Sequence, residues 1–145
     1  MSSLNNSWQF WAIAAAVFAA MTAIFAKVGI ENVDSDFATF IRTLIIAAVL
    51  LVMLSVMGKW QSPGTLSGRT WLFLTLSALA TGASWLAYFR ALKLGDAARV
   101  APLDKLSIVL VAIFGVIFLG EKLAPANWFG VVLILAGVLL VSWKV

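Results

Sequence analysis

The chain has 145 residues, of which 63% are hydrophobic and only 11% are charged. Soluble domains hold about 45–50% apolar and about 25% charged residues, so water is not the main solvent of this surface. Cys and His are both absent, which excludes disulfides, thiolate nucleophiles, imidazole bases and Cys/His metal sites. The net charge of +4 is not gathered into a basic run, so nucleic-acid binding is not expected. No cofactor is predicted either.

Five apolar runs are long enough to cross a membrane, because a hydrocarbon layer of about 30 Å needs about 20 helical residues. Backbone groups in lipid must bond within their own segment, and the runs lack the alternation of barrel strands. The polar residues 1–7 lack a basic cluster, and the long run behind them is expected to remain as an anchor. We predict an all-α polytopic membrane protein with a single domain over residues 1–145 and helices at 8–29, 37–57, 70–93, 97–119 and 125–143.

The breaks between these runs carry helix-ending and helix-capping residues. An acidic or hydroxyl side chain at 34–36 is expected to cap the second helix. Gly95 followed by Asp96 predicts a stop and then a cap, hence a tight hairpin. Gly120 is expected to end the fourth helix, and Glu121 beyond it is expected to be a solvated loop acid.

The membrane orientation is not decided by the basic residues. With four Lys and Arg set aside as lying in helices or at their edges, three remain on each side: Lys59, Arg69 and Lys122 against Lys27, Lys93 and Lys144. Counting the four tilts the chain toward a cytoplasmic C-terminus. A chain without bias can insert both ways and pair with its own inverted copy, so an antiparallel homodimer is our hypothesis.

The segment GDAARVAPLDKLS, residues 95–107, places charge inside a predicted span. Asp104 lies seven residues into the run at 97–119, and Lys105 follows it. A charge at the centre of a membrane helix costs on the order of 2.5–3.5 kcal/mol, so such residues usually face protein or an aqueous cavity. One interpretation is a polar helix start from which Lys105 extends outward. The other is that Pro102 kinks the helix and opens a cavity where Asp104 exchanges an ion and Lys105 holds an anion.

Two arginines in neighbouring helices are candidate partners for Asp104. Arg42 lies early in the second run and Arg90 near the end of the third, so both belong to the membrane half where the fourth run starts. Trp85 and Tyr88 are three residues apart and share a helix face. These rings either form the wall of a substrate site or pack ordinarily.

The C-terminal half, YFRALKLGDAARVAPLDKLSIVLVAIFGVIFLGEKLAPANWFGVVLILAGVLL, resembles the EamA domain of the drug/metabolite transporter superfamily. The matching features are Ala-Leu-Lys at 91–93, Pro102, Leu-Gly-Glu at 119–121, Gly130 and Ala136-Gly137, with Arg42 where members often carry a basic residue. The resemblance implies a transporter fold and transport of small organic metabolites. Most members have ten helices in two inverted halves, whereas this chain looks like the short, five-helix bacterial and archaeal branch.

That resemblance implies a multi-pass protein of the bacterial or archaeal cytoplasmic membrane. The four-helix small multidrug resistance branch carries an essential Glu in its first helix, and residues 8–29 contain no carboxylate. Asp104 is therefore the expected coupling acid. We predict a secondary transporter of amphiphilic or zwitterionic metabolites, proton-coupled, with a substrate and ion site at Asp104, Lys105, Arg42, Arg90, Trp85 and Tyr88.

The sequence also bears on two other classes of protein. A membrane subunit that partners another protein or a lipid remains an alternative. An enzyme is not expected, because Ser84 has no histidine to activate it and only one carboxylate lies deep in a span.

Overall fold

A computed structural model describes residues 7–143, and these residues form helices, turns and loops without a strand. Five helical stretches are long and apolar enough to span a bilayer, which confirms the predicted all-α fold with five spans. The chain is a multi-pass membrane protein. Residues 1–6 and 144–145 lie outside the described part, and with them all of the polar N-terminal segment except Ser7, and Lys144 of the charge count.

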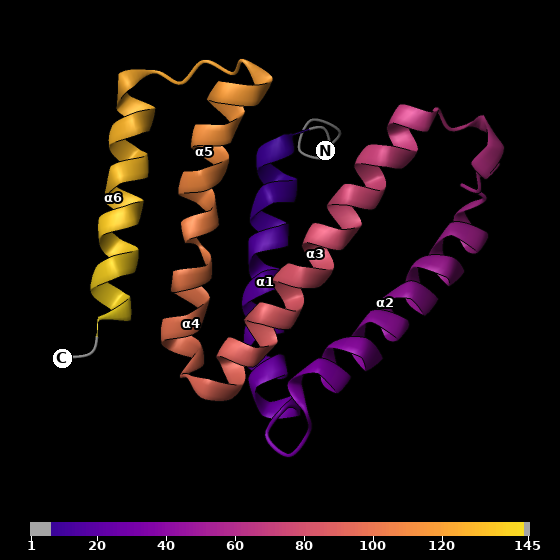
Figure 1. The fold of residues 1–145 in the computed structure, drawn as a ribbon, viewed down its shortest axis with the longest axis horizontal. Coiled ribbons are helices and arrows are strands. Elements are labelled where there is room, and N and C mark those ends of the chain that lie inside the picture. The colour runs from indigo at the N-terminus through magenta and orange to yellow at the C-terminus, as the bar shows by residue number, and fades with distance from the viewer. Residues whose placement is uncertain (1–6, 144–145) are drawn as a thin grey trace. The chain divides into compact units, whose positions relative to one another are not determined.

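The helix bounds follow the predicted runs closely (Figure 1). The fourth span, Ala97–Leu119, consists of two consecutive helices. The elements are α1 (Trp8–Gly29), α2 (Ser35–Met57), the short 3-10 helix η2 (Pro63–Thr65), α3 (Gly68–Leu94), α4 (Ala97–Asp104), α5 (Leu106–Leu119) and α6 (Pro125–Ser142).

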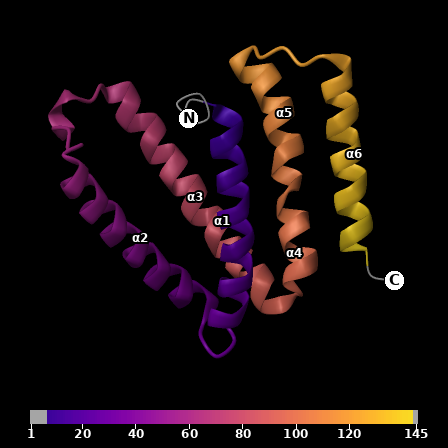
Figure 2. The ribbon, with the colours of Figure 1, turned by 180° about the vertical axis from the view of Figure 1, so that it is seen from behind.

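The described residues group into two compact units. The first unit holds Val28–Lys93, with α2, α3 and the end of α1; the second holds the described residues up to Lys27 and from Leu94 onward. In the first unit α2 and α3 run antiparallel, joined by the connection that contains η2 (Figure 2). In the second unit α6 packs along α4 and α5.

The core of the first unit lies where the α1–α2 turn meets the end of α3. Ile30 and Leu92 are buried almost completely, and Phe89 is buried nearly as fully. Lys93 donates hydrogen bonds from its ammonium to the carbonyl oxygens of Ile30, Glu31 and Val33. These three carbonyls follow a helix end, where backbone acceptors lack intrahelical partners, so Lys93 closes the turn.

Two of the expected helix-end residues behave as predicted and one does not. Asp34 caps α2, because its carboxylate accepts hydrogen bonds from the backbone N–H groups of Asp36 and Phe37 at 3.0 Å each. Gly120 ends α5 with a left-handed φ of 69°, which suits a residue without Cβ. The expected side-chain cap by Asp96 is wrong, since its side chain makes no capping hydrogen bond; instead it borders a hollow of about 280 Å³ in the second unit.

Large apolar side chains cover most of the outer surface. Leu140 and Phe118 are 76% and 75% exposed, and such residues recur along every span. In water this would strongly favour aggregation. In a bilayer these side chains contact acyl chains, so the exposed apolar surface agrees with five lipid-embedded spans.

Candidate functional site

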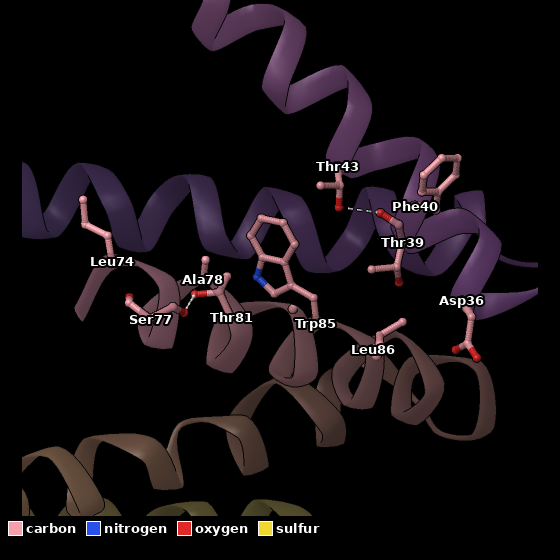
Figure 3. A pocket seen from close by; sticks show the side chains of 11 residues that line it. Asp36, Thr39, Phe40, Thr43, Leu74, Ser77, Ala78, Thr81, Trp85 and Leu86 are labelled. Atoms are coloured by element: carbon pink, nitrogen blue, oxygen red, sulfur yellow. Dashed lines mark hydrogen bonds between the residues drawn. The ribbon is translucent and has the colours of Figure 1, made fainter. Parts of the chain in front are cut away.

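The first unit contains a pocket of about 560 Å³ between α2 and α3 (Figure 3). Its volume falls within the range of about 300–1,000 Å³ typical of small-molecule sites. Its aromatic and apolar lining residues are Trp85, Phe40, Leu74, Ala78, Gly82 and Leu86. Its polar lining residues come from both helices, with Asp36, Thr39 and Thr43 on α2 and Ser77 and Thr81 on α3.

The threonine hydroxyls of the pocket are arranged as hydrogen-bond acceptors. Thr39, Thr43 and Thr81 each donate their hydroxyl hydrogen to the carbonyl four residues earlier on their own helix, at 2.8 Å. A hydroxyl oxygen keeps its lone pairs when its hydrogen is used in this way. The pocket therefore offers acceptors to the N–H or O–H groups of a ligand.

Arg42 does not line the pocket but lies over Trp85, which does. Its guanidinium carbon lies 4.4 Å from the ring centroid of Trp85 and 5.3 Å from that of Phe89. Arg42 lies seven residues after Ser35, the first residue of α2, or about 10 Å along the axis. A charge deep in a span costs on the order of 2.5–3.5 kcal/mol, and a desolvated cation–π contact returns about 2 kcal/mol. The two rings thus offset much of the cost of placing Arg42 there.

Arg90 and Asp36 form an ion pair at the pocket, with 2.8 Å between Nη2 and Oδ2. The side chains are 65% and 46% exposed. Pairs with this exposure contribute about 0–1 kcal/mol, so the bridge can open at little cost. Asp36 is thus both a member of this ion pair and a pocket residue, whereas the sequence suggested only a helix-capping role for residues 34–36.

Trp85 and Tyr88, expected together at the site, have different surroundings. Trp85 lines the pocket, and its indole ring lies between the two helices (Figure 3). Tyr88 is half-buried and packs edge-on against Phe89, with 6.4 Å between ring centroids. The pocket residues include Trp85 and exclude Tyr88.

Asp104 and Lys105 lie in the second unit, at the junction of α4 and α5. Lys105 donates to Oδ2 of Asp104 at 3.0 Å, with side chains 50% and 36% exposed. The sequence favoured Arg42 and Arg90 as partners of Asp104, because adjacent helical residues point about 100° apart. Regular helix stops at Lys105, which lets neighbouring side chains meet, and Arg90 forms its ion pair with Asp36.

The fourth span is interrupted three residues beyond Pro102. The N–H of Lys105 bonds to the carbonyl of Pro102 at 2.9 Å, a tighter turn than an α-helix makes. Proline has no N–H to donate to the carbonyl four residues earlier. The interruption therefore lies close to Pro102 and places Asp104 and Lys105 at an irregular point of the span.

The hydroxyl groups that line the pocket from both helices were not identified from the sequence. The signal that could have found them is the spacing of four residues between Thr39 and Thr43 and between Ser77 and Thr81, which places each pair on one helix face. No group of three or more acidic, His or Cys side chains suited to a metal ion occurs among the described residues.

Five apolar spans with a pocket of mixed polar and aromatic character inside one helix pair are typical of a membrane protein that handles small molecules. The chain belongs to the EamA-like transporter family, whose model matches residues 6–143.

Two relatives have informative names. The chain is 66% identical over 139 residues to an uncharacterized transporter in the cobO 3′ region of Sinorhizobium sp., covering 96% of this chain and 99% of the relative. It is 29% identical over 85 residues to a probable 4-amino-4-deoxy-L-arabinose-phosphoundecaprenol flippase subunit ArnE of Yersinia pestis, covering 58% of this chain and 75% of that protein. No solved structure matches.

Proposed function

We propose that this protein is a secondary transporter that moves a small amphiphilic or zwitterionic metabolite across the cytoplasmic membrane of a bacterium or archaeon. The observation that carries the proposal is the α2–α3 pocket, which combines an indole wall with a row of hydroxyl acceptors. An amphiphile needs both surfaces at once. The apolar part of the substrate contacts Trp85, and its N–H or O–H groups donate hydrogen bonds to the threonine hydroxyl oxygens.

Proton coupling is assigned to Asp104. Its carboxylate lies at an interruption of a membrane span and is paired with Lys105. Protonation of Asp104 releases the lysine, so proton uptake and a local rearrangement of the helix junction occur together. One of the cationic side chains Lys105, Arg42 and Arg90 then holds the anionic group of the substrate.

An antiparallel homodimer is the proposed working form. Support comes from the equal number of basic residues on the two sides once the four within or at the edges of the predicted spans are set aside, and from the inverted halves found within many single-chain transporters. Cysteine labelling from both sides of the membrane tests it, because labelling of each engineered loop from one side only excludes dual orientation.

A non-transporting or accessory subunit is a second candidate function. It is favoured by the name of the Yersinia relative, which describes a flippase subunit. In that case the chain requires a different membrane protein for activity. The purified chain alone then shows no flux in liposomes, whereas co-reconstitution with a partner captured from the native membrane restores it.

The transport proposal is tested in proteoliposomes loaded with a metabolite pool, with and without a pH gradient. Asp104→Asn is expected to abolish gradient-driven uptake while folding is retained. Asp96→Asn is the matched control, because Asp96 is an exposed acid at the start of α4 that forms no side-chain cap. Unchanged uptake by Asp104→Asn removes Asp104 from the mechanism.

A further inference from the structure

Three charged side chains lie around the pocket of the first unit, one negative and two positive, so they cannot all form ion pairs with one another. Asp36 lines the pocket and is bound to Arg90 at 2.8 Å. Arg42 stacks on Trp85, another pocket residue, and no ion pair within residues 28–93 includes it. Of the two arginines beside the pocket, Arg90 therefore has a counter-charge in this unit and Arg42 has none.

The contacts of Arg42 leave its hydrogen-bonding capacity unused. A guanidinium group has five N–H donors in its plane. The rings of Trp85 and Phe89 contact the guanidinium without accepting those donors, and within residues 28–93 Arg42 makes no side-chain hydrogen bond. Planar donors of this kind match the two oxygens of a carboxylate or phosphate.

The position of Arg42 on α2 places it beside the pocket. Asp36, Thr39, Phe40 and Thr43 form the pocket stripe of this helix, with the spacing expected of one face. Arg42 lies next to Thr43 and three residues from Thr39, at the border of that stripe. Arg42 does not itself line the pocket, but its guanidinium carbon lies 4.4 Å from the ring centroid of the pocket residue Trp85, which brings its donors close to a ligand that contacts that ring.

We infer that the α2–α3 pocket is an oxyanion site in which Arg42 binds the carboxylate or phosphate of an amphiphile, and that it rejects amphiphiles whose only charge is positive. This inference rests on the proposed transport role and names the substrate class. It selects Arg42 among the cationic candidates, because Arg90 and Lys105 each already bind a carboxylate, at 2.8 and 3.0 Å. Trp85 acts as a positioning residue that holds the guanidinium plane.

Binding to the full chain in phosphatidylcholine nanodiscs tests the inference, with empty nanodiscs to subtract partitioning. The probes share an eight-carbon tail and differ in head group: octyl phosphate, octanoate, octyl glucoside and octyltrimethylammonium. We expect octyl phosphate to bind at least about tenfold more tightly than octyltrimethylammonium, as hydrogen bonds to charged groups suggest. Equal or tighter binding of the cation overturns the inference.

Substitutions locate the effect. Arg42→Gln is expected to weaken octyl phosphate binding by about tenfold or more, and Arg42→Lys to restore part of it. Arg69→Gln is the matched control, because Arg69 also lies over a ring, with 5.9 Å to the centroid of Phe73, but that ring is near the other end of α3 and does not line the pocket. Equal losses in Arg42→Gln and Arg69→Gln contradict a specific site. If Arg42→Gln fails to fold, the head-group preference of the unmodified protein and the Arg42→Lys variant still decide the question.

Two further experiments distinguish a lipid from a free metabolite as the ligand, and binding from transport. Adding phosphatidylglycerol to the nanodiscs shows whether a lipid head group supplies the oxyanion: competition with octyl phosphate supports a lipid, and lack of competition supports a free metabolite. Flux is measured separately in proteoliposomes. Flux without an anion preference overturns the oxyanion site alone, whereas Arg42-dependent binding without flux overturns transport alone.

Discussion

The ammonium nitrogen of Lys93 lies 2.6 Å from the carbonyl oxygen of Ile30, joining the end of α3 to a turn 63 residues earlier in the chain. The same nitrogen donates to the carbonyls of Glu31 and Val33 at 2.8 and 3.0 Å. One ammonium thus uses all three of its hydrogens on backbone acceptors. The contact fixes the turn that precedes α2 and with it the start of the helix that carries the pocket.

Replacing Lys93 by Met is expected to destabilise the protein by about 1.5–3 kcal/mol, because three carbonyls lose a charged donor. Thermal unfolding in detergent measures the change. Lys59→Met is the control, since Lys59 is an exposed lysine just after the end of α2, and no hydrogen bond of its ammonium is found within the described residues. Equal shifts for the two variants contradict the role of Lys93.

The cap of α2 predicts a dependence on pH. The hydrogen bonds from the N–H groups of Phe37 and then Asp36 hold the pKa of Asp34 below its ordinary value of 3.8. A depressed folded-state pKa stabilises the fold above the unfolded pKa, and this contribution is lost as pH falls through the folded value. Asp34→Asn keeps a capping oxygen but does not titrate.

Circular dichroism in detergent during acid titration checks this prediction. The stability difference between the native protein and Asp34→Asn should shrink below the ordinary pKa of 3.8. A difference that stays constant through the acid range shows that Asp34 does not titrate in the expected way.

Gly115 and Glu121 are expected to be coupled. A Cβ added at Gly115 would lie 2.6 Å from Oε2 of Glu121, so the exposed loop acid expected from the sequence folds back over α5. Gly115→Ala must displace this flexible side chain, whereas Gly137 has nothing within 4 Å of an added Cβ. A double-mutant cycle with Glu121→Ala should give a coupling energy of about 0.5–1 kcal/mol. A coupling energy near zero would show that the carboxylate moves freely. The cycle of Gly137→Ala with Glu121→Ala is the control and should give a coupling energy of zero.

The bridge between Arg90 and Asp36 is expected to matter more for ligand binding than for stability. Each single substitution, Arg90→Gln or Asp36→Asn, should change unfolding by less than about 1 kcal/mol, because the pair is well exposed. Asp36→Asn should strengthen binding of octyl phosphate, since it removes the one carboxylate of the pocket and frees Arg90. Weaker anion binding by Asp36→Asn would argue against this electrostatic account.

The sequence predicted the five spans well because each depends on local quantities, length and apolarity, and the bounds of α1 coincide with the expected run 8–29. The pairings were not accessible in the same way. Arg90 binds Asp36, 54 residues away in the chain, and Lys93 donates to backbone carbonyls and not to an acid. Both contacts depend on how α3 packs against the α1–α2 turn. The hydroxyl groups of the pocket lining were also missed, because threonine in an apolar run resembles an ordinary lipid-compatible residue until its helix face is known.

The break of the fourth span illustrates the same limit. Pro102 indicates that a carbonyl loses its partner, but the position where regular helix stops, Lys105, depends on which neighbouring N–H groups form tighter turns. The side-chain directions of Asp104 and Lys105 follow from that position. In an ideal helix these two neighbouring side chains would point apart, whereas in the structure they form an ion pair at 3.0 Å.

The most direct test of the account is solute flux by the purified chain in proteoliposomes when the α2–α3 pocket is filled by a side chain. Thr81→Trp adds an indole inside the pocket, and Leu79→Trp adds one on α3 at a residue that is 67% exposed and does not line it. The account predicts saturable flux by the native protein and Leu79→Trp, and loss of flux by a folded Thr81→Trp. Undiminished flux in Thr81→Trp, or no flux by the native chain, would contradict it.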